Sequence, residues 1–401
     1  MREVLTFVLA GGKGERLDPL TRDRAKPAVP FGGIYRIVDF ALSNCVNSGL
    51  RRIFLLTQYK SFSLQRHILE GWNIYSNQLG EFIDVVPAQQ RISSDWYRGT
   101  ADAIYQNLNM VGDYDPSLVL ILAGDHVYKM DYRKLIDYHV DKGADMTVAC
   151  VTMPKSDSIH FGVVEVNKQN MVEGFQEKPE KPRTIPHSPN EIFGSMGIYL
   201  FNTETLKKEL ADDAARTDSG HDFGKNIIPQ MLAKKLKVFA YDFAKENEIS
   251  PYWRDIGTRD SYYQANMDLC GPKPKFSLDD KSWPLRTSHH RYTPLRVYTT
   301  GKTPGSVVDS LIAGGCVLES ARVEHSVVSN NVVIRDGVLI RNSVIMDSVT
   351  IGKGAQIQGA IIDKNVNIPA GTKIGFYPAL DRQRFVLTTS GIVIVAKKTS
   401  L

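Results

Sequence analysis

The feature that most constrains this fold is a six-residue period in the last quarter of the chain. Aliphatic residues recur at that spacing in three runs, which are Leu311, Val317 and Val323; Val327, Val333, Leu339, Ile345, Ile351 and Ile357; and Ile362, Ile368 and Ile374. Such a period is neither helical nor simply alternating. It is typical of hexapeptide repeats, in which each side of a β-helix coil directs one aliphatic residue inward. An ordinary β-sheet that repeats by chance explains the three phased runs less well.

Up to about residue 270 the chain has a different rhythm, because short apolar runs alternate with amphipathic segments. The runs are "VLTFVLA", "RIFLLTQ", "SLVLILAGD", "DMTVACVTM" and "GSMGIYLFN", and Asp39–Ser48 and Thr100–Tyr114 are two of the amphipathic segments. This alternation predicts an α/β domain with a mixed, largely parallel sheet that is covered on both faces. Ligands of such sheets bind beyond the carboxyl ends of the strands, so we expect Gly11–Arg16 and Asp125 at one edge.

The region between the two rhythms, from "CGPKPKF" to "YTTGKTPGS", is rich in Pro, Lys and Thr. It is typical of a linker, and its length favours packing on a surface. The expected domains are therefore residues 1–272, a linker at 273–305 and a repeat domain at 306–401, which we expect to serve in oligomerisation and regulation.

The charge balance favours small anionic ligands over nucleic acid. The net charge is +5, from 49 basic and 44 acidic residues without long runs of either sign. Cys45, Cys150, Cys270 and Cys316 lie far apart and form no C-x-x-C pair, which favours reduced thiols over disulfides or metal ligands. No apolar stretch is long enough for a membrane span, and Val4–Ala10 is too short for a signal peptide. These observations predict a cytoplasmic protein without a nucleic-acid or membrane partner.

The stretch "LAGGKGERL" follows the first apolar run. Its glycines would let backbone N–H groups approach phosphate oxygens, and a following helix would add a favourable dipole. It is not a Walker A sequence, and the dinucleotide fingerprint fails at Leu17. Taken alone, a structural turn and a phosphate loop are equally good interpretations. Arg16 and Lys26 nearby favour a polyphosphate ligand. The guanidinium of Arg16 can donate two parallel hydrogen bonds, and the ammonium of Lys26 is a compact positive charge.

"LAGGKGERL" followed by "AKPAVPFGG" resembles the signature of sugar-nucleotide pyrophosphorylases. The blocks "DFALSNCVNSG", "PAQQR", "DWYRGTADA", "ILAGDHVYKMDY", "EKP", "SMGIYLF", "HDFGKNIIP" and "PYWRDIGT" are similar to the bacterial glucose-1-phosphate adenylyltransferases. The resemblance spans nearly the whole chain. It implies a Rossmann-like nucleotidyltransferase domain followed by a left-handed β-helix. The implied reaction converts ATP and α-glucose 1-phosphate to ADP-glucose and pyrophosphate with Mg²⁺, as the first committed step of glycogen biosynthesis.

The resemblance also implies the catalytic and metal-binding residues. Asp125, with His126 beside it, matches the catalytic aspartate that binds the metal, and Asp255 matches a second carboxylate on the magnesium. Arg16 and Lys26 complete the implied catalytic set. From the residues alone, Asp125 could simply be part of a turn, and Asp255 could be a helix cap or an ion-pair partner of Arg254.

Two substrate sites follow from the same blocks. The implied ATP site comprises Leu9, Ala10, Gly11, Gly12, Gly14, Gln89, Gly99 and Thr100. The implied glucose 1-phosphate site comprises Tyr97, Gly162, Glu177, Lys178 and Ser195. Alternatives remain open for three of these residues: Lys178 could be a solvated lysine, Gly162 a turn glycine and Ser195 a hydroxyl on a strand face.

The resemblance further implies a homotetramer whose activity is controlled by a phosphorylated metabolite. The expected regulatory anion site combines Arg24 and Arg36 with Lys364 of the repeat region, where a phosphorylated sugar or sulfate would bind. Asp23 stands where members activated by fructose 1,6-bisphosphate typically carry lysine, so a strong response to that compound is not expected. An exposed basic surface is the alternative for each of these arginines.

Three other functions fit parts of the pattern. A pyrophosphorylase that uses UTP or dTTP would share the glycine loop and "EKP", but "PAQQR", "WYRGTADA" and "PYWRDIGT" favour ATP. A regulatory subunit without catalysis commonly loses catalytic residues, whereas this chain keeps Arg16, Asp125 and Lys178. An acyltransferase would use a longer coil and usually a catalytic histidine, and only His325 follows residue 305.

Overall fold

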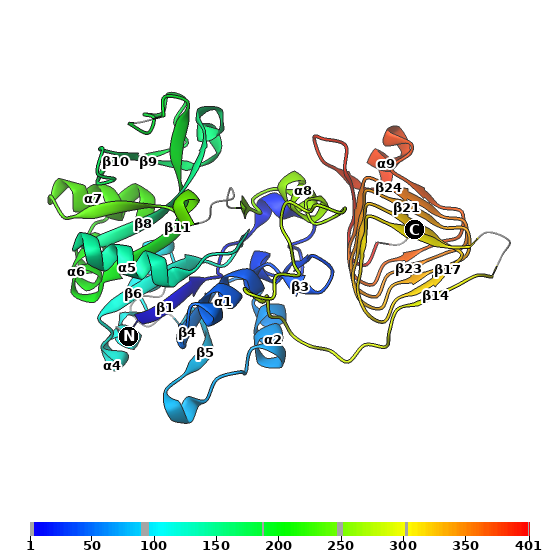
Figure 1. The fold of residues 1–401 in the computed structure, drawn as a ribbon, viewed down its shortest axis with the longest axis horizontal. Coiled ribbons are helices and arrows are strands. Elements are labelled where there is room, and N and C mark those ends of the chain that lie inside the picture. The colour runs from blue at the N-terminus through cyan, green and yellow to red at the C-terminus, as the bar shows by residue number, and fades with distance from the viewer. Residues whose placement is uncertain (1–3, 90–95, 187, 247–251, 301–303, 400) are drawn as a thin grey trace.

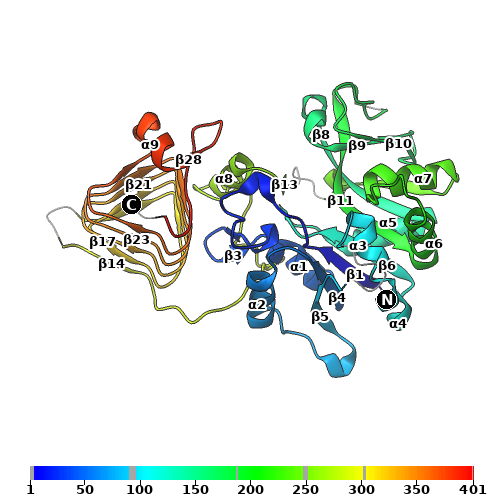
Figure 2. The same cartoon turned by 180° about the vertical axis from the view of Figure 1, so that it is seen from behind.

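The protein consists of an α/β domain and a three-sided β-helix, and helix α8 (Arg259–Met267) lies between them (Figures 1 and 2). The computed structural model describes residues 4–89, 96–186, 188–246, 252–300, 304–399 and 401. Within these ranges, no helix has both the length and the apolar character that a membrane crossing requires.

The α/β domain is built on a mixed nine-stranded sheet. Its main path runs β10 (Val172–Glu177), β9 (Gly162–Val166), β11 (Glu191–Asn202), β6 (Leu118–Ala123), β1 (Val4–Leu9), β4 (Arg52–Thr57) and β5 (Phe82–Pro87), and β8 (Met146–Pro154) joins β11 to β12 (Val238–Asp242). The strands from β6 to β5 are parallel, and β11 is antiparallel to each of its neighbours. The expected mixed sheet is confirmed.

Helices cover both faces of this sheet. One apolar core packs under α1 (Val38–Asn47), α2 (Phe62–Gly71) and α5 (Tyr132–Lys142). A second core packs under α3 (Thr100–Tyr105), α4 (Leu108–Tyr114), α6 (Thr203–Ala214) and α7 (Ile228–Ala233). The segment from Thr100 to Tyr114 therefore forms two helices. The helical segment is interrupted before Asn107. The side-chain amide of Asn107 donates to the carbonyl of Ala103 (2.7 Å), a partner that would otherwise accept from the backbone of the same residue in a continuous helix.

The repeats form three parallel sheets that are the sides of the β-helix. The first contains β14 (Arg296–Tyr298), β17 (Val317–Glu319), β20 (Val333–Ile334), β23 (Thr350–Ile351) and β26 (Asn367–Ile368). The second contains β15 (Ser306–Val308), β18 (Arg322–Glu324), β21 (Leu339–Arg341), β24 (Gln356–Gln358) and β27 (Lys373–Ile374). The third contains β16 (Leu311–Ile312), β19 (Val327–Val328), β22 (Val344–Ile345), β25 (Ala360–Ile362), β29 (Val393–Val395) and antiparallel β28 (Val386–Leu387). Helix α9 (Pro378–Arg384) precedes β28.

The inward-facing residues of the β-helix only partly match the expected ladder. Seven expected residues do line its interior, namely Val323, Ile345, Ile351, Ile357, Ile362, Ile368 and Ile374. At five coil sides the following residue faces inward instead, so the prediction was wrong for Leu311, Val317, Val327, Val333 and Leu339, whose places are taken by Ile312, Leu318, Val328, Ile334 and Ile340. The physical reason is that each of these short strands begins with two consecutive aliphatic residues. The alternation of a strand turns only one of them inward.

The outward residues of the third sheet pack on the α/β domain. Val327, Val344 and Ile361 share a buried cluster with Leu17 and Phe31 from the N-terminal region. The same cluster includes Tyr262 of α8, whose hydroxyl donates to the carbonyl of Pro30 (2.7 Å). The β-helix is thus joined to the α/β domain by a continuous apolar core.

The linker packs on the α/β domain, as its length suggested. Asn47 donates to the carbonyl of Pro284 (2.9 Å), and Thr287 donates to the carboxylate of Asp39 (2.7 Å). The expected start of the repeat domain at residue 306 is too late, because β14 already pairs with β17. The sequence before residue 306 is too weakly periodic to show this.

Candidate active site

The glycine loop and Asp125 meet at the carboxyl edge of the sheet. Strands β1 and β6 run parallel with Leu9 opposite Ala123, and the amide of Gly124 donates to the carbonyl of Leu9 (3.0 Å). The segments that follow the two strands therefore emerge side by side, as expected from the alternating pattern.

The loop presents bare backbone to a cleft of about 380 Å³. Gly11 and Gly12 line this cleft, and a Cβ atom at Gly12 would meet only open space. The loop is followed by a single 3-10 turn, Glu15–Leu17, so the full helix dipole that would favour an anion is absent from this described segment. The exposed side chain of Arg16 also lines the cleft and supplies positive charge in its place.

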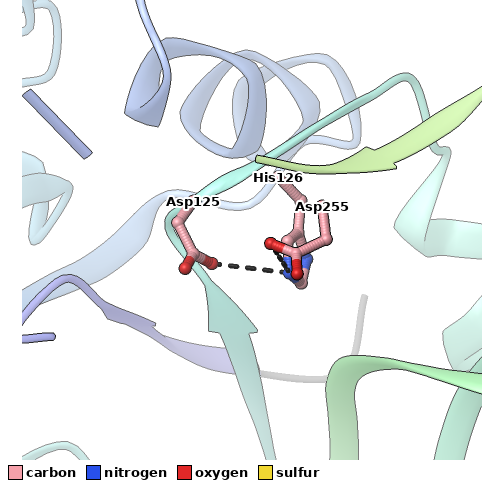
Figure 3. Close-up of side chains that lie close together, drawn as sticks. All are labelled: Asp125, His126 and Asp255. Atoms are coloured by element: carbon pink, nitrogen blue, oxygen red, sulfur yellow. Dashed lines mark ion pairs between the residues drawn. The ribbon is translucent and has the colours of Figure 1, made fainter. Parts of the chain in front are cut away.

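Two carboxylates and a histidine converge beside the loop (Figure 3). Asp125 precedes β7 (His126–Tyr128), which pairs with β13 (Trp253–Asp255) so that Asp255 lies opposite His126. Nε2 of His126 is 3.5 Å from an oxygen of Asp125 and 3.8 Å from an oxygen of Asp255. One ligand atom from each of the three residues lies within 4.8 Å of the other two. The antiparallel pair thus brings together carboxylates from distant parts of the chain.

Asp255 does not form the ion pair with Arg254 that the sequence left open. The guanidinium of Arg254 is 3.4 Å from the carboxylate of Asp268. Asp255 instead pairs with Lys26, whose Nζ is 3.1 Å away.

Lys26 bridges the two carboxylates from the buried side of the cluster. Its Nζ is 2.7 Å from Oδ2 of Asp125 and 3.1 Å from Oδ1 of Asp255. Burial opposes the charged form of Lys26, but the two carboxylates outweigh it and raise the pKa of Lys26. Burial also opposes the charge of Asp125, yet Lys26 and His126 outweigh it and lower the pKa of Asp125 to about 2. Asp125 is therefore an ionised carboxylate at neutral pH.

The donor set suits a hard divalent cation. Mg²⁺ prefers oxygen ligands and is usually held by one or two carboxylates together with water and substrate phosphates. Asp125 and Asp255 are about 30% exposed on the cleft side, so each offers oxygen atoms to a cation there. The nitrogen of His126 is a poorer ligand for Mg²⁺ and is better placed to orient the carboxylates.

A second group of lining residues comes from β9, β10 and β11. Gly162 and Glu177 are register partners, and Ser195 on β11 lines the same cleft. Lys178 follows β10 with φ of 50°, and its amide donates to the carbonyl of Phe161 (3.0 Å). This left-handed conformation is uncommon for a residue with a side chain and is often retained at functional sites. Nζ of Lys178 is 3.9 Å from the carboxylate of Glu177 and about half exposed, so it is open to an anion in the cleft.

Several lining residues were not singled out from the sequence, and Asp222 is the most informative. Its Oδ1 accepts from the amides of Gly224 and Lys225, which caps the turn Phe223–Ile227, and its Oδ2 accepts from the hydroxyl of Thr100 (3.1 Å). The block "HDFGKNIIP" contains this capping residue, but an aspartate before a helical turn indicates only a cap. The other unpredicted lining residues include His160, Phe161, Phe175, Tyr199 and Trp253.

Five residues expected at the substrate sites do not line the cleft formed by the described residues, namely Ala10, Gly14, Gln89, Tyr97 and Gly99. Tyr97 accepts a hydrogen bond from the Asn107 amide at 2.9 Å. A Cβ atom on Gly99 would lie 2.3 Å from the carbonyl oxygen of His221, so this glycine permits a close backbone approach. The rest of the "PAQQR" block after Gln89 lies outside the described residues. Leu9 and Thr100 do line the cleft.

A second cavity, of about 80 Å³, lies between the two domains and contains two of the three expected regulatory residues. Arg36 and Lys364 both line it, with Asp347. Arg36 donates to the carbonyl and hydroxyl of Ser63 (both 2.8 Å), and Nζ of Lys364 is 3.0 Å from Asp347. Burial lowers the pKa of each of these two cations. A compact anion in the cavity would relieve the repulsion between them.

Arg24 does not line this cavity, and its charge is already neutralised. Its Nη2 is 2.6 and 2.8 Å from the two oxygens of Asp363, and both side chains are buried. The sequence analysis expected Arg24 to help clamp an anion, and in the structure an aspartate of the β-helix already lies directly against its guanidinium.

Family models and sequence relatives agree with this architecture. Residues 5–271 match the nucleotidyl transferase family, and residues 294–395 match the GlmU-like C-terminal hexapeptide family. A protein of Koribacter versatilis named glucose-1-phosphate adenylyltransferase is 47% identical over 100% of this chain and 97% of its own length. Proteins with the same name from Methylococcus capsulatus and Rhodopirellula baltica are each 48% identical, over 98% and 99% of this chain and 93% and 90% of their own lengths.

Proposed function

The chain belongs to the glucose-1-phosphate adenylyltransferase family, and from its cleft we propose that it transfers the adenylyl group of ATP to α-glucose 1-phosphate. The products are ADP-glucose and pyrophosphate, and the step commits glucose to glycogen. The observation that carries the proposal is the single cleft that joins the glycine loop, the Asp125–Asp255 pair and the Glu177–Lys178 end of β10.

The reaction needs no general base from the protein. A phosphate oxygen of glucose 1-phosphate attacks the α-phosphorus of ATP, a new P–O bond forms, and the bond to the β-phosphate oxygen breaks to release pyrophosphate. The attacking phosphate is largely a dianion at neutral pH, since its second pKa is about 6. The protein must therefore align two anions that repel each other and stabilise the leaving group.

The loop side of the cleft meets the requirements for ATP. The amides of Gly11 and Gly12 and the guanidinium of Arg16 bind the phosphates of ATP, while Leu9 and Thr100 line the nucleotide end. Asp125 and Asp255 would hold Mg²⁺, which when bound would neutralise charge on the phosphates and the leaving group. Lys26 lowers the pKa of Asp125 and orients both carboxylates from their buried side, through its contacts of 2.7 and 3.1 Å.

The β10 side of the cleft takes the sugar phosphate. Lys178 binds the phosphate of glucose 1-phosphate, and the carboxylate of Glu177 accepts hydrogen bonds from sugar hydroxyls. Ser195 and Asp222 add polar groups to the cleft, and Asp222 also accepts from Thr100 of the nucleotide side. Lys178 has a φ of 50°, and such uncommon backbone conformations are often retained at functional sites.

A comparison of three nucleotides as substrates separates this function from a pyrophosphorylase that uses UTP or dTTP and from a regulatory subunit without catalysis. Purified protein is incubated with glucose 1-phosphate, Mg²⁺ and ATP, UTP or dTTP in turn, and pyrophosphate release is measured. We expect ATP to be used at least about tenfold faster than either alternative, which corresponds to about 1.4 kcal/mol of discrimination. Equal or faster release with UTP or dTTP would overturn the assignment to ATP, and no release with any nucleotide would favour a regulatory subunit.

We further propose a cytoplasmic homotetramer. All four cysteines are buried free thiols, which suits a reducing compartment. Among the described residues, the apolar core shared with the α/β domain takes its strand residues of the β-helix from the third sheet, and we propose that the other two sheets contact other subunits.

The cavity between the domains is the proposed site of a regulatory anion, a phosphorylated metabolite or sulfate. Arg36 and Lys364 would bind the anion directly. Arg24 would contribute indirectly, because its ion pair with Asp363 holds the residue next to Lys364 in place. If the anion binds more tightly to one arrangement of the two domains than to another, it increases the population of that arrangement. The size of the resulting change in activity is set by the difference between the two affinities. Asp23, whose carboxylate is 3.9 Å from Lys398, would repel a second phosphate nearby.

Lys364→Ala tests this site. In a screen of phosphorylated metabolites, the concentration that gives half-maximal activation should rise about tenfold in the variant, because one charge-assisted contact is lost. Activity without effector should be nearly unchanged. Lys353→Ala, which removes a mostly exposed lysine paired with Asp336 on the same β-helix, is the matched control. An identical response in both variants would remove Lys364 from the site.

A further inference from the structure

The ring of Phe175 lies in a notch between two glycines at the cleft. A Cβ atom on Gly162 would lie 2.4 Å from Cζ of Phe175, and a Cβ atom on Gly224 would lie 2.6 Å from the same ring atom. Both distances are far below van der Waals contact. The ring and both glycines line the cleft, and the ring also packs on the apolar core beneath it. One ring tip therefore occupies the space that two side chains would otherwise fill.

The backbone does not explain either glycine. Neither Gly162 nor Gly224 has a φ in the left-handed region, where glycine would be favoured for conformational reasons. Gly162 is a strand residue of β9, and Gly224 lies in the turn Phe223–Ile227. An alanine would fit the backbone at both positions, so the Phe175 ring is what excludes a side chain there.

The strand register places the ring beside the groups that face the sugar phosphate. Phe175 and Glu177 are two residues apart on β10 and so lie on one face of the sheet. Val164 is opposite Phe175 and Gly162 is opposite Glu177, which makes Gly162 the diagonal neighbour of Phe175 on that face. From there the ring tip reaches Gly224, whose amide donates to Asp222.

We propose that Phe175 is a positioning residue for the sugar substrate. Its ring sets the separation between the Glu177–Lys178 end of β10 and the turn capped by Asp222, and it forms an apolar floor for the C–H face of the hexose. This inference rests on the proposed function, because it states how that function's sugar site is built. Gly11 and Gly12 follow β1, which is separated from β10 by three strands of the sheet, so we expect the ring to act on the sugar phosphate rather than on the phosphates of ATP.

The test is the kinetics of Phe175→Leu, which removes the ring tip but keeps an apolar side chain. We expect KM for glucose 1-phosphate to rise about tenfold, since small displacements of binding groups are costly, while KM for ATP changes less than about twofold. Phe239→Leu is the matched control, because Phe239 is a buried aromatic residue of the same sheet that does not line the cleft. It should lower the melting temperature without changing either KM.

Gly224→Ala provides the second, independent test. Its new Cβ atom must displace the ring, so KM for glucose 1-phosphate should rise in the wild-type background. In the Phe175→Leu background that ring atom is missing, and the added methyl group should have little further effect. An equal effect of Gly224→Ala in both backgrounds, or an unchanged KM in Phe175→Leu, would overturn the proposal. If the wild-type protein forms ADP-glucose but the variants give one of these two overturning results, only the role of Phe175 is refuted. If the wild-type protein forms no ADP-glucose, the proposed function is refuted as well.

Discussion

Asp125→Asn should lower kcat for ADP-glucose formation by about a thousandfold or more, the scale seen when one preorganised electrostatic contact to a transition state is lost. The amide keeps the shape of the carboxylate but removes its charge. Asp255 would then be the remaining anionic ligand of the pair for Mg²⁺. The concentration of Mg²⁺ required for half-maximal rate should rise as well, since divalent cations bind through carboxylate charge.

The position of Lys26 adds to this effect. In the wild-type protein its ammonium is shared by Asp125 and Asp255, so the lysine and the two carboxylates taken together carry one net negative charge. In Asp125→Asn the ammonium and Asp255 cancel, so the cluster loses the charge that attracts a cation.

Steady-state rates at several Mg²⁺ concentrations measure both effects. The matched control is Asp141→Asn, the same change at an exposed position of α5 outside the cleft, which should leave kcat unchanged. A kcat within about tenfold of wild type for Asp125→Asn would contradict the assignment of this carboxylate to the metal.

Arg24→Ala should destabilise the protein by about 3–5 kcal/mol, because it leaves the carboxylate of Asp363 buried without its partner. The Asp363 side chain is 1% exposed, and Arg24 contacts both of its oxygens at 2.6 and 2.8 Å. The backbone amide of Lys364 would be its remaining described donor, at 2.7 Å. The pair joins the N-terminal region to the β-helix, so its loss should weaken the contact between the domains.

Urea unfolding at one fixed protein concentration measures this loss of stability. Arg216→Ala is the matched control, because its partner Asp218 and its own side chain are largely exposed, and such pairs contribute at most about 1 kcal/mol. The double variant Arg24→Met/Asp363→Leu should recover much of the stability, since it removes both buried charges. Equal losses in Arg24→Ala and Arg216→Ala would contradict this interpretation. Effector studies should rely on Lys364, because Arg24→Ala combines lost charge with lost stability.

Much of the active site could be predicted because its residues follow strands. Gly11 and Asp125 come directly after β1 and β6, and neighbouring parallel strands end at one edge, so their meeting followed from the pattern alone. The roles proposed for Lys178 and Asp255 were expected only from the family resemblance, because a lysine in a charged turn and an aspartate after an arginine have commoner explanations. Phe175 could not be found in this way, since its role depends on two glycines that are distant from each other in sequence.

The sequence by itself determined the two architectures, because strand and coil periods are local properties of the chain. It did not determine which residue of pairs such as Val327–Val328 faces the interior of the β-helix. Both are aliphatic, and the choice was made when Val327 packed on the α/β domain and Val328 turned inward. The same contact between domains placed Asp363 against Arg24 and so converted an expected ligand for an anion into a buried structural pair. Only the tertiary structure could decide these points, because each depends on which side chains of the two domains are buried against one another when the domains pack.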